Sequence, residues 1–219
     1  NYPKTLDSDI NLLIKNECNC LFLPDQSILN NIKKIESSYK SQYLCGLNRP
    51  GHFDGVITIV NRFLELTKPE FCFFGQKDFQ QQIIIKNHLK ENNFSTKLIV
   101  GQTIRDKKGL ALSSRNNYLS ESEKKEASLI YKYLKEIAVL MKQIYSDNPS
   151  ELSKKASIIC KEYKNKFEAR GFKIDYLEII NAKNLKKIKN EETQFVIAVA
   201  THYKGVRLID NLECDLSFS

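Results

Sequence analysis

The pattern of apolar and polar residues between positions 71 and 100 predicts a strand, a helix and a second strand. Four apolar residues at positions 71–74 form a short buried strand that ends at Gly75, and the helix that follows is expected to reach about residue 92. A second apolar run, at residues 97–100, follows a polar break. Strand, helix and strand in this order make a βαβ unit, whose parallel strands need their faces covered.

The segment before this unit predicts a helix, a short strand and a second helix. Thr5 is placed to cap the first helix, and residues 20–23 form the strand. Residues 25–48 are too weakly patterned to assign. The second helix follows the turn-rich residues 48–55 and ends at Pro69. Its buried stripe is expected to hold four apolar residues, namely Val56, Ile59, Val60 and Phe63.

After residue 101 the pattern changes from α/β to α+β. A loop at residues 101–117 leads into two long helices, which are expected at residues 121–146 and 150–170. Three strands close the chain, and the break at residues 203–205 joins the last two as a tight antiparallel hairpin. The expected strands cover residues 174–180, 195–201 and 206–212.

The composition excludes several classes of protein. The 219 residues are 42% hydrophobic and 27% charged, which is typical of a globular protein with a sizeable core. No apolar run approaches the length that crosses a bilayer, and no signal peptide is found, so no membrane partner is expected. The six cysteines form no C-x-x-C pair and only three histidines accompany them. A zinc site is therefore not expected, and the cysteine usage fits a reducing, cytoplasmic compartment.

The net charge of +8 leaves two kinds of partner open, a nucleic acid or a polyanionic small molecule. Most of the excess is lysine, spread among glutamates on helical faces. The sequence has no arginine cluster and no basic strip with interleaved aromatic residues, which base readout and stacking normally use. Nucleic acid is therefore not an expected partner.

Candidate chemistry lies where the strand at residues 71–74 meets the helix. In open α/β sheets, ligands bind outside the carboxyl ends of the strands, and helix N-termini there attract phosphate. Gly75 allows close backbone approach, Lys77 adds a positive charge, and Gln81 lies one helical turn after Lys77 on the same face. A ligand with a phosphate near Lys77 would extend along the helix to Gln81. The local pattern leaves simpler alternatives open, with Asp78 as an ordinary N-cap and Lys77 as a solvated loop lysine.

A second candidate is the run Ser113-Ser114-Arg115 in the following loop. Two hydroxyls and the permanent guanidinium fork have the chemistry of a mobile clamp for a triphosphate. Taken alone, this tripeptide is usually no more than a loop. Together with the Gly75–Asp78 stretch it becomes much more specific.

With both stretches in place, the chain resembles the pantothenate synthetase (pantoate–β-alanine ligase) family of the nucleotidylyltransferase-like α/β superfamily. The resemblance spans nearly the whole chain, with its motifs in family order. It implies a partial Rossmann-like (nucleotidylyltransferase-type) parallel-sheet domain at residues 1–101. A smaller α+β lid domain with a three-stranded antiparallel sheet is implied at residues 102–219. The motifs are Asn1-Tyr2-Pro3-Lys4-Thr5-Leu6, Arg49-Pro50-Gly51-His52-Phe53-Asp54-Gly55-Val56, Lys68-Pro69, Gly75-Gln76-Lys77-Asp78-Phe79-Gln80-Gln81, Gly109-Leu110-Ala111-Leu112-Ser113-Ser114-Arg115-Asn116 and Val206-Arg207-Leu208-Ile209-Asp210-Asn211.

The resemblance implies an ATP-dependent condensation of (R)-pantoate with β-alanine to pantothenate, through a pantoyl-adenylate. It implies Mg²⁺ alongside the substrate ATP, and a homodimer. Lys77 and Arg115 are the implied catalytic residues, with Asp78 near the ribose, the backbone of Ile104 on adenine and Gln81 on pantoate. The implied ATP site comprises Gly75, Gln76, Lys77, Asp78, Ile104, Leu112, Ser113, Ser114 and Arg115.

The chain departs from the family pattern in several places. Gln76 and Cys45 stand where the family usually has Glu, and neither the His-x-Gly-His phosphate motif nor the pantoate-binding Gln of the second strand occurs. We therefore expect two βα units, roughly 60 residues or more, to be missing ahead of Asn1, and residues 1–219 alone to be inactive. His52 is the tempting substitute, although a histidine leading a helix more often caps or packs.

Two other interpretations stay open. One is a non-catalytic nucleotide-binding or dimer-forming remnant of the enzyme. The other is a different nucleotidylyltransferase on the same fold, and the Arg49–Val56 and Val206–Asn211 motifs argue against it.

Overall fold

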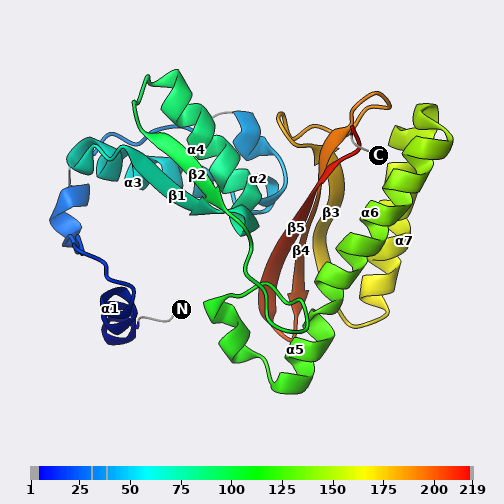
Figure 1. The fold of residues 1–219 in the computed structure, drawn as a ribbon, viewed down its shortest axis with the longest axis horizontal. Helices are drawn as coiled ribbons and strands as arrows, with labels where there is room; N and C mark the ends of the chain where they lie inside the picture. The colour runs from blue at the N-terminus through cyan, green and yellow to red at the C-terminus, as the bar shows by residue number, and fades with distance from the viewer. Residues whose placement is uncertain (1–4, 31, 38, 218–219) are drawn as a thin grey trace. The chain divides into compact units, whose positions relative to one another are not determined.

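The computed structural model describes residues 5–30, 32–37 and 39–217, and it divides the chain into two compact units, residues 1–33 and 34–219 (Figure 1). Residues 1–4 of the first family motif lie outside the described residues. In the first unit, helix α1 (Leu6–Lys15) begins directly after Thr5, as predicted, and is followed by η1 (Gln26–Leu29). The predicted strand at residues 20–23 is wrong, because no strand among the described residues pairs with this segment to satisfy its backbone groups.

The first half of the second unit contains the predicted βαβ unit. Strands β1 (Phe71–Gly75) and β2 (Lys97–Gly101) pair in parallel, with Phe71 opposite Lys97 and Gly75 opposite Gly101. Helix α4 (Phe79–Glu91) connects them after the short turn η3 (Gln76–Asp78). Ahead of β1 lie η2 (Tyr39–Gln42), α2 (Cys45–Asn48) and α3 (His52–Thr67).

Strand β1 is not the fully buried strand that its apolar run predicts. Cys72 and Phe74 pack against the cluster formed by α3 and α4, whereas Phe73 on the opposite face is 74% exposed. The prediction fails because this sheet has two strands among the described residues, with helical packing on one face. Side chains that alternate along a strand therefore alternate between burial and exposure.

Helix α3 packs through a face that is shifted from the predicted stripe. The residues that it buries are Phe53, Ile57 and Leu64, while Ile59 is 40% exposed. Val60 and Val56 pack at the edge of the same cluster. Several rotations of this helix satisfy a stripe of apolar residues, so only its packing against α4 and β1 selects one.

Among its described residues, the second half forms three α-helices and a three-stranded antiparallel sheet in the order β3-β4-β5. The strands are β3 (Lys173–Asn181), β4 (Gln194–Tyr203) and β5 (Val206–Asp215), close to their predicted ranges. After the short turn η4 (Ser114–Tyr118), the first predicted helix is divided at Ser128 into α5 (Glu121–Ala127) and α6 (Leu129–Asp147). The turn η5 (Pro149–Glu151) then leads into α7 (Leu152–Glu168), which is the second predicted helix. None of the helices in the described part of the chain has the length and apolar character needed to span a membrane.

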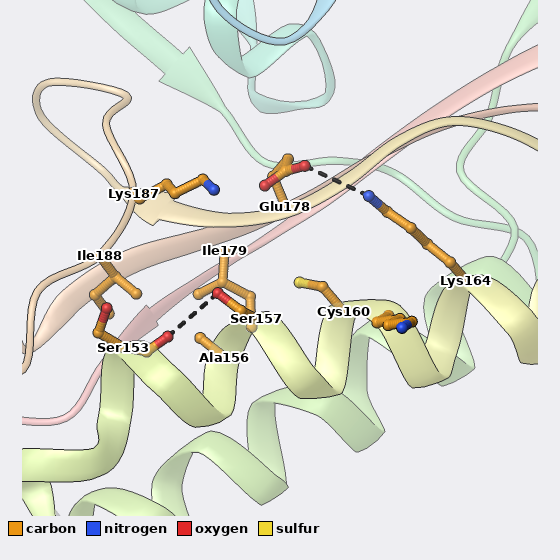
Figure 2. Close-up of a pocket in the computed structure, with 10 residues that line it drawn as sticks. Ser153, Ala156, Ser157, Cys160, Lys164, Glu178, Ile179, Lys187 and Ile188 are labelled. Atoms are coloured by element: carbon orange, nitrogen blue, oxygen red, sulfur yellow. Dashed lines mark hydrogen bonds and ion pairs between the residues drawn. The ribbon is translucent and has the colours of Figure 1, made fainter.

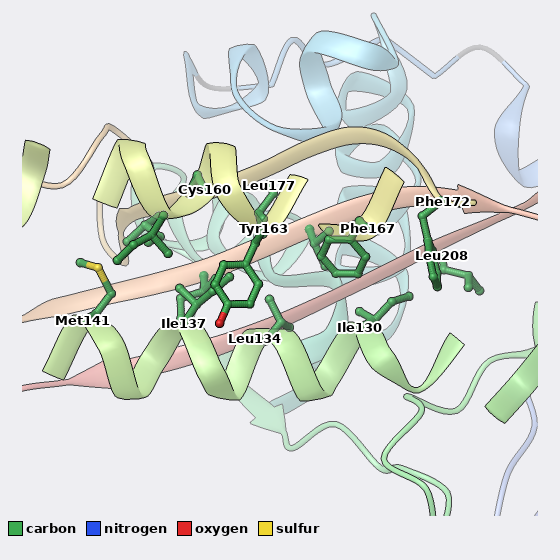
Figure 3. Close-up of a cluster of buried hydrophobic side chains, with 14 of the residues drawn as sticks. Ile130, Leu134, Ile137, Met141, Cys160, Tyr163, Phe167, Phe172, Leu177 and Leu208 are labelled. Carbon is green, nitrogen blue, oxygen red and sulfur yellow. The ribbon is translucent and has the colours of Figure 1, made fainter. Parts of the chain in front are cut away.

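Helices α6 and α7 cover one face of this sheet and form the largest core (Figures 1 and 3). The central strand β4 is buried on both faces: Phe195 and Ile197 enter the helical core, while Val196 and Ala198 pack on the other side with Leu44, Phe79, Ile180 and Leu185. This second contact joins the sheet to the start of α4. It brings β5 beside the η3 turn, where candidate chemistry is predicted.

Candidate active site

The turn between β1 and α4 leaves open space beside Gly75. Gly75 ends β1 in register with the end of β2, and its own backbone is extended, at φ −80°. A Cβ at Gly75 would meet no atom within 4 Å, so neither strain nor packing requires glycine here. Asp78 occupies the N-cap position of α4, but its exposed side chain makes no capping hydrogen bond. The turn therefore leaves space at Gly75 and leaves the Asp78 carboxylate available to a ligand.

Lys77 connects this turn to the second candidate stretch. Its Nζ donates to the backbone carbonyl of Leu112 over 3.2 Å, across 35 positions of sequence. Burial lowers the pKa of Lys77, against the opposing influence of Asp78 and Asp210. Lys77 is therefore not a freely solvated loop lysine, and the structure brings the two predicted stretches together.

The loop at residues 101–117 contains more order than its weak apolar pattern predicts. Arg105 and Ala111 form an isolated antiparallel bridge, and the amide of Leu112 donates to the carbonyl of Ile104 over 2.9 Å. The Asp106 Oδ1 accepts from the amides of Lys108 and Leu110. The Ile104 side chain is 68% exposed. Backbone hydrogen bonds and the Asp106 carboxylate thus hold this loop in place. Neither kind of contact produces a periodic pattern of apolar residues, so the sequence did not reveal this order.

The predicted phosphate clamp follows directly. Ser113 caps η4, and its Oγ accepts from the amide of Arg115 at 3.3 Å. Asn116 donates from Nδ2 to the carbonyl of Ala111, which ties the start of η4 back to the loop. Arg115 is close enough to Lys77 that its positive charge lowers the pKa of the lysine. Ser114 and Arg115 are partly exposed, with no hydrogen bond from either side chain to another described residue.

Strand β5 supports both stretches through two adjacent residues whose structural role the sequence analysis missed. Asn211 donates from Nδ2 to the backbone carbonyls of Gln76, over 3.0 Å, and Lys77, over 2.9 Å. Asp210 accepts from the guanidinium of Arg105 at 2.5 and 2.9 Å, and that guanidinium also lies 3.6 Å from the ring centroid of Tyr131. Burial raises the pKa of Asp210, while Arg105 opposes that rise.

A signal for this support was present in the sequence. A polar Asp-Asn pair inside the apolar strand predicted at residues 206–212 needs partners, because buried carboxylates are rarely tolerated without a cation. The sequence did not indicate which residue would pair with Asp210, because its partner Arg105 lies 105 positions away.

Basic residues from two other segments, around Arg49 and at Arg207, lie near the site. Arg207 and Arg115 both act electrostatically on Arg49, and burial together with these cations lowers the pKa of Arg49. Burial also lowers the pKa of His52, followed by the charge of Arg49, while Asp78 opposes the change. The site therefore carries an excess of positive charge, which favours a polyanion. Gln81 lies on α4 one turn beyond Lys77, partly exposed and without a hydrogen bond to another described residue.

A cavity of about 240 Å³ lies between α7 and β3, away from the candidate site, and none of the predicted site residues lines it (Figure 2). Lys164 and Glu178 form an ion pair at 3.5 Å along its wall. Burial raises the pKa of Cys160 to about 12, so this cysteine remains a protonated thiol at neutral pH. A protonated thiol is a poor nucleophile, and the cavity is not a candidate catalytic centre.

Comparison with known proteins shows which family this chain resembles. Residues 1–213 match the family model described as pantoate-β-alanine ligase. A pantothenate synthetase from Marinomonas sp. (strain MWYL1) is 38% identical over 98% of this chain and 75% of its own length. The pantothenate synthetase of Thermus thermophilus superposes with a TM-score of 0.83 at 29% identity, covering 96% of this chain and 75% of that one. The pantoate-β-alanine ligase of Francisella tularensis, complexed with β-γ ATP and β-alanine, gives 0.72 at 32% identity, covering 96% and 70%.

The electrostatics of the site predict a change in the pKa of His52 when Arg49 is neutralised. Arg49→Gln removes a cation that holds this pKa down, so the pKa should rise while burial still keeps it below its ordinary value. A lowered pKa means that protonation favours the unfolded state. The stability from neutral His52 is therefore present above about pH 6.5 and is lost as pH falls through the folded pKa.

Titration of the imidazole resonances by NMR measures this shift. His88 serves as an internal control, because burial lowers its pKa and only Glu91 and Glu65 act on its charge. A His52 pKa that is unchanged in Arg49→Gln would show that the two groups are too far apart to interact.

Proposed function

The chain belongs to the pantoate–β-alanine ligase family, and we propose that its Gly75–Asp78 turn and its Leu112–Arg115 loop together bind the ATP of that reaction. The reaction joins pantoate to β-alanine in pantothenate biosynthesis. The observation that carries the assignment of residues is the bond from Lys77 to the carbonyl of Leu112, which unites the two stretches within a positively charged site.

The chemistry proposed for the site has two steps. A carboxylate oxygen of pantoate attacks the α-phosphate of ATP, the bond to the β-phosphate breaks, and pyrophosphate leaves with that electron pair. The amine of β-alanine then attacks the acyl carbon of the pantoyl-adenylate, and AMP departs as the amine loses a proton. Both steps place charge on phosphate oxygens, so fixed cations and donors accelerate them chiefly by position and electrostatics.

Each predicted residue has a role in this proposal that its position supports. Lys77 and Arg115 neutralise charge that develops on the phosphates, while Ser113 and Ser114 donate from their hydroxyls. The exposed Asp78 carboxylate accepts from the ribose hydroxyls. The backbone of Ile104 and Leu112 lines the adenine end of the site, Gly75 and Gln76 form the floor of the turn, and Gln81 binds pantoate.

We propose that Mg²⁺ enters with ATP. Among the described residues, no three His, Cys, Asp or Glu side chains converge as metal ligands. This fits Mg²⁺, which is commonly held by substrate phosphates, water and one or two carboxylates. The ion would supply further neutralisation of the triphosphate.

The wider organisation of the enzyme is also a proposal. We assign nucleotide and pantoate binding to residues 1–101 and the covering lid to residues 102–219, supported by the separate cores on α3–α4 and α6–α7. The homodimer rests on the family resemblance. The cysteines of the described residues are all free, which supports a reducing, cytoplasmic environment.

Lys77→Ala and Arg115→Ala, made in the full-length protein, should each slow the adenylation step at least about a hundredfold, since loss of one preorganised donor or charge commonly has this effect. Pyrophosphate release at saturating pantoate measures the step. Lys90→Ala, at an exposed position near the end of α4, is the matched control and should leave the rate unchanged. Wild-type pyrophosphate release in either site variant would remove that residue from the proposed role.

Gln81→Ala should raise the KM for pantoate several-fold while the KM for ATP changes little. The loss of one hydrogen bond to a neutral group costs on the order of 1 kcal/mol, or about fivefold in affinity. Initial rates measured with each substrate varied in turn separate the two constants. Equal changes in both would contradict the assignment of Gln81 to pantoate.

A further inference from the structure

A cavity of about 570 Å³ lies between α4, the end of β2 and the end of the antiparallel sheet. Its volume falls in the range of small-molecule sites. Among the predicted ATP residues, only Gln76 lines it. The lining comprises Gln76, Phe79, Gln82, Ile83, Lys86, Asn87, Val100, Gln102, Ala182, Lys183, Gln194 and Glu213.

Gln82 is the observation that points to a ligand. The residue is only 5% exposed, its side-chain amide makes no hydrogen bond to any other described residue, and that amide still has accessible surface. An accessible amide without a protein partner is free to hydrogen-bond to a bound molecule or to water. Its place in the cavity lining leaves a donor and an acceptor available to a bound molecule.

The remaining lining defines the chemistry of that molecule. Lys86 and Lys183 contribute two positive charges, whereas Glu213 contributes one negative charge and already accepts from Nε2 of Gln76 at 3.3 Å. The excess of positive charge favours a single anionic group. Asn87 and Gln102 add further amide donors and acceptors, and an aliphatic wall is formed by Ile83, Val100 and Ala182.

We propose that this cavity binds a small aliphatic carboxylate that carries amide or hydroxyl groups, at a site separate from the catalytic one. Pantothenate belongs to this class, because it combines one carboxylate with an amide, two hydroxyls and a short carbon chain. Choosing it as the ligand rests on the proposed function. Gln76 connects the two sites, since its side chain lines the cavity while its carbonyl accepts from Asn211 beside Lys77.

Calorimetric titration of the full-length protein with sodium pantothenate tests this proposal. The Gln82→Leu variant keeps the volume of the side chain but removes the amide, and it should lose one binding event per chain relative to the wild-type protein. Gln143→Leu, at an exposed position of α6, is the matched control and should keep that event. Gln81→Ala should also keep it, because Gln81 belongs to the proposed catalytic site.

Lys183→Gln provides a second variant in an exposed loop, in case Gln82→Leu folds poorly. It should weaken the same event at least about tenfold, as expected for the loss of one charged hydrogen bond. Identical binding by wild type and both variants, or no binding event besides the one weakened in Gln81→Ala, would overturn the proposal. Ligase activity is assayed in parallel: Gln82→Leu should retain it, whereas an inactive wild-type enzyme would instead refute the proposed function.

Discussion

Two adjacent residues on strand β5 hold the candidate active site together. Successive side chains of a strand point to opposite faces of the sheet, so Asp210 and Asn211 project to different sides from one short stretch of backbone. Asp210 pairs with Arg105 in the loop at residues 101–117. Asn211 donates to the carbonyls of Gln76 and Lys77 in the turn that follows β1. Strand β5 therefore sets the distance between the turn after β1 and the loop at residues 101–117. Lys77 adds a direct contact between them by donating to the carbonyl of Leu112.

This arrangement places unfavourable electrostatics inside the protein. Lys77 and Arg49 both have lowered pKa values because they are partly buried near other cations, and the pKa of Asp210 is raised by burial despite its ion pair. Removing one partner of a buried ion pair typically costs about 3–5 kcal/mol, so the Arg105–Asp210 pair is held firmly once formed. The excess positive charge would be relieved by a polyanionic ligand. Local conflict of this kind is common at functional sites, where stability is given up for binding.

The sequence predicted the parts of the fold that have a strong local pattern, and it missed those set by distant contacts. The βαβ unit and the antiparallel hairpin were found because apolar runs and turn residues mark them. The strand at residues 20–23 was wrong and the packing face of α3 was shifted, since pairing and helix rotation depend on elements elsewhere in the chain. Within the candidate site, the strand–turn–helix pattern pointed to Lys77 and side-chain chemistry to the Ser113–Arg115 run. The structure brings the two stretches together at Leu112, and their roles stay predictions. The support from Asp210 and Asn211 depends on contacts across more than 100 positions and leaves no local period.

Asn211 holds the turn that carries Lys77, so its contribution to catalysis should depend on that lysine. A double-mutant cycle on the full-length enzyme, with Asn211→Ala and Lys77→Ala and kcat/KM for ATP as the readout, measures this directly. If Asn211 works through Lys77, removing it from the Lys77→Ala enzyme costs little more, and the double variant is far less impaired than the sum of the two single losses. Thermal unfolding of each variant checks that the fold is intact. Losses that add to within about 0.5 kcal/mol, in variants that remain folded, would contradict the account.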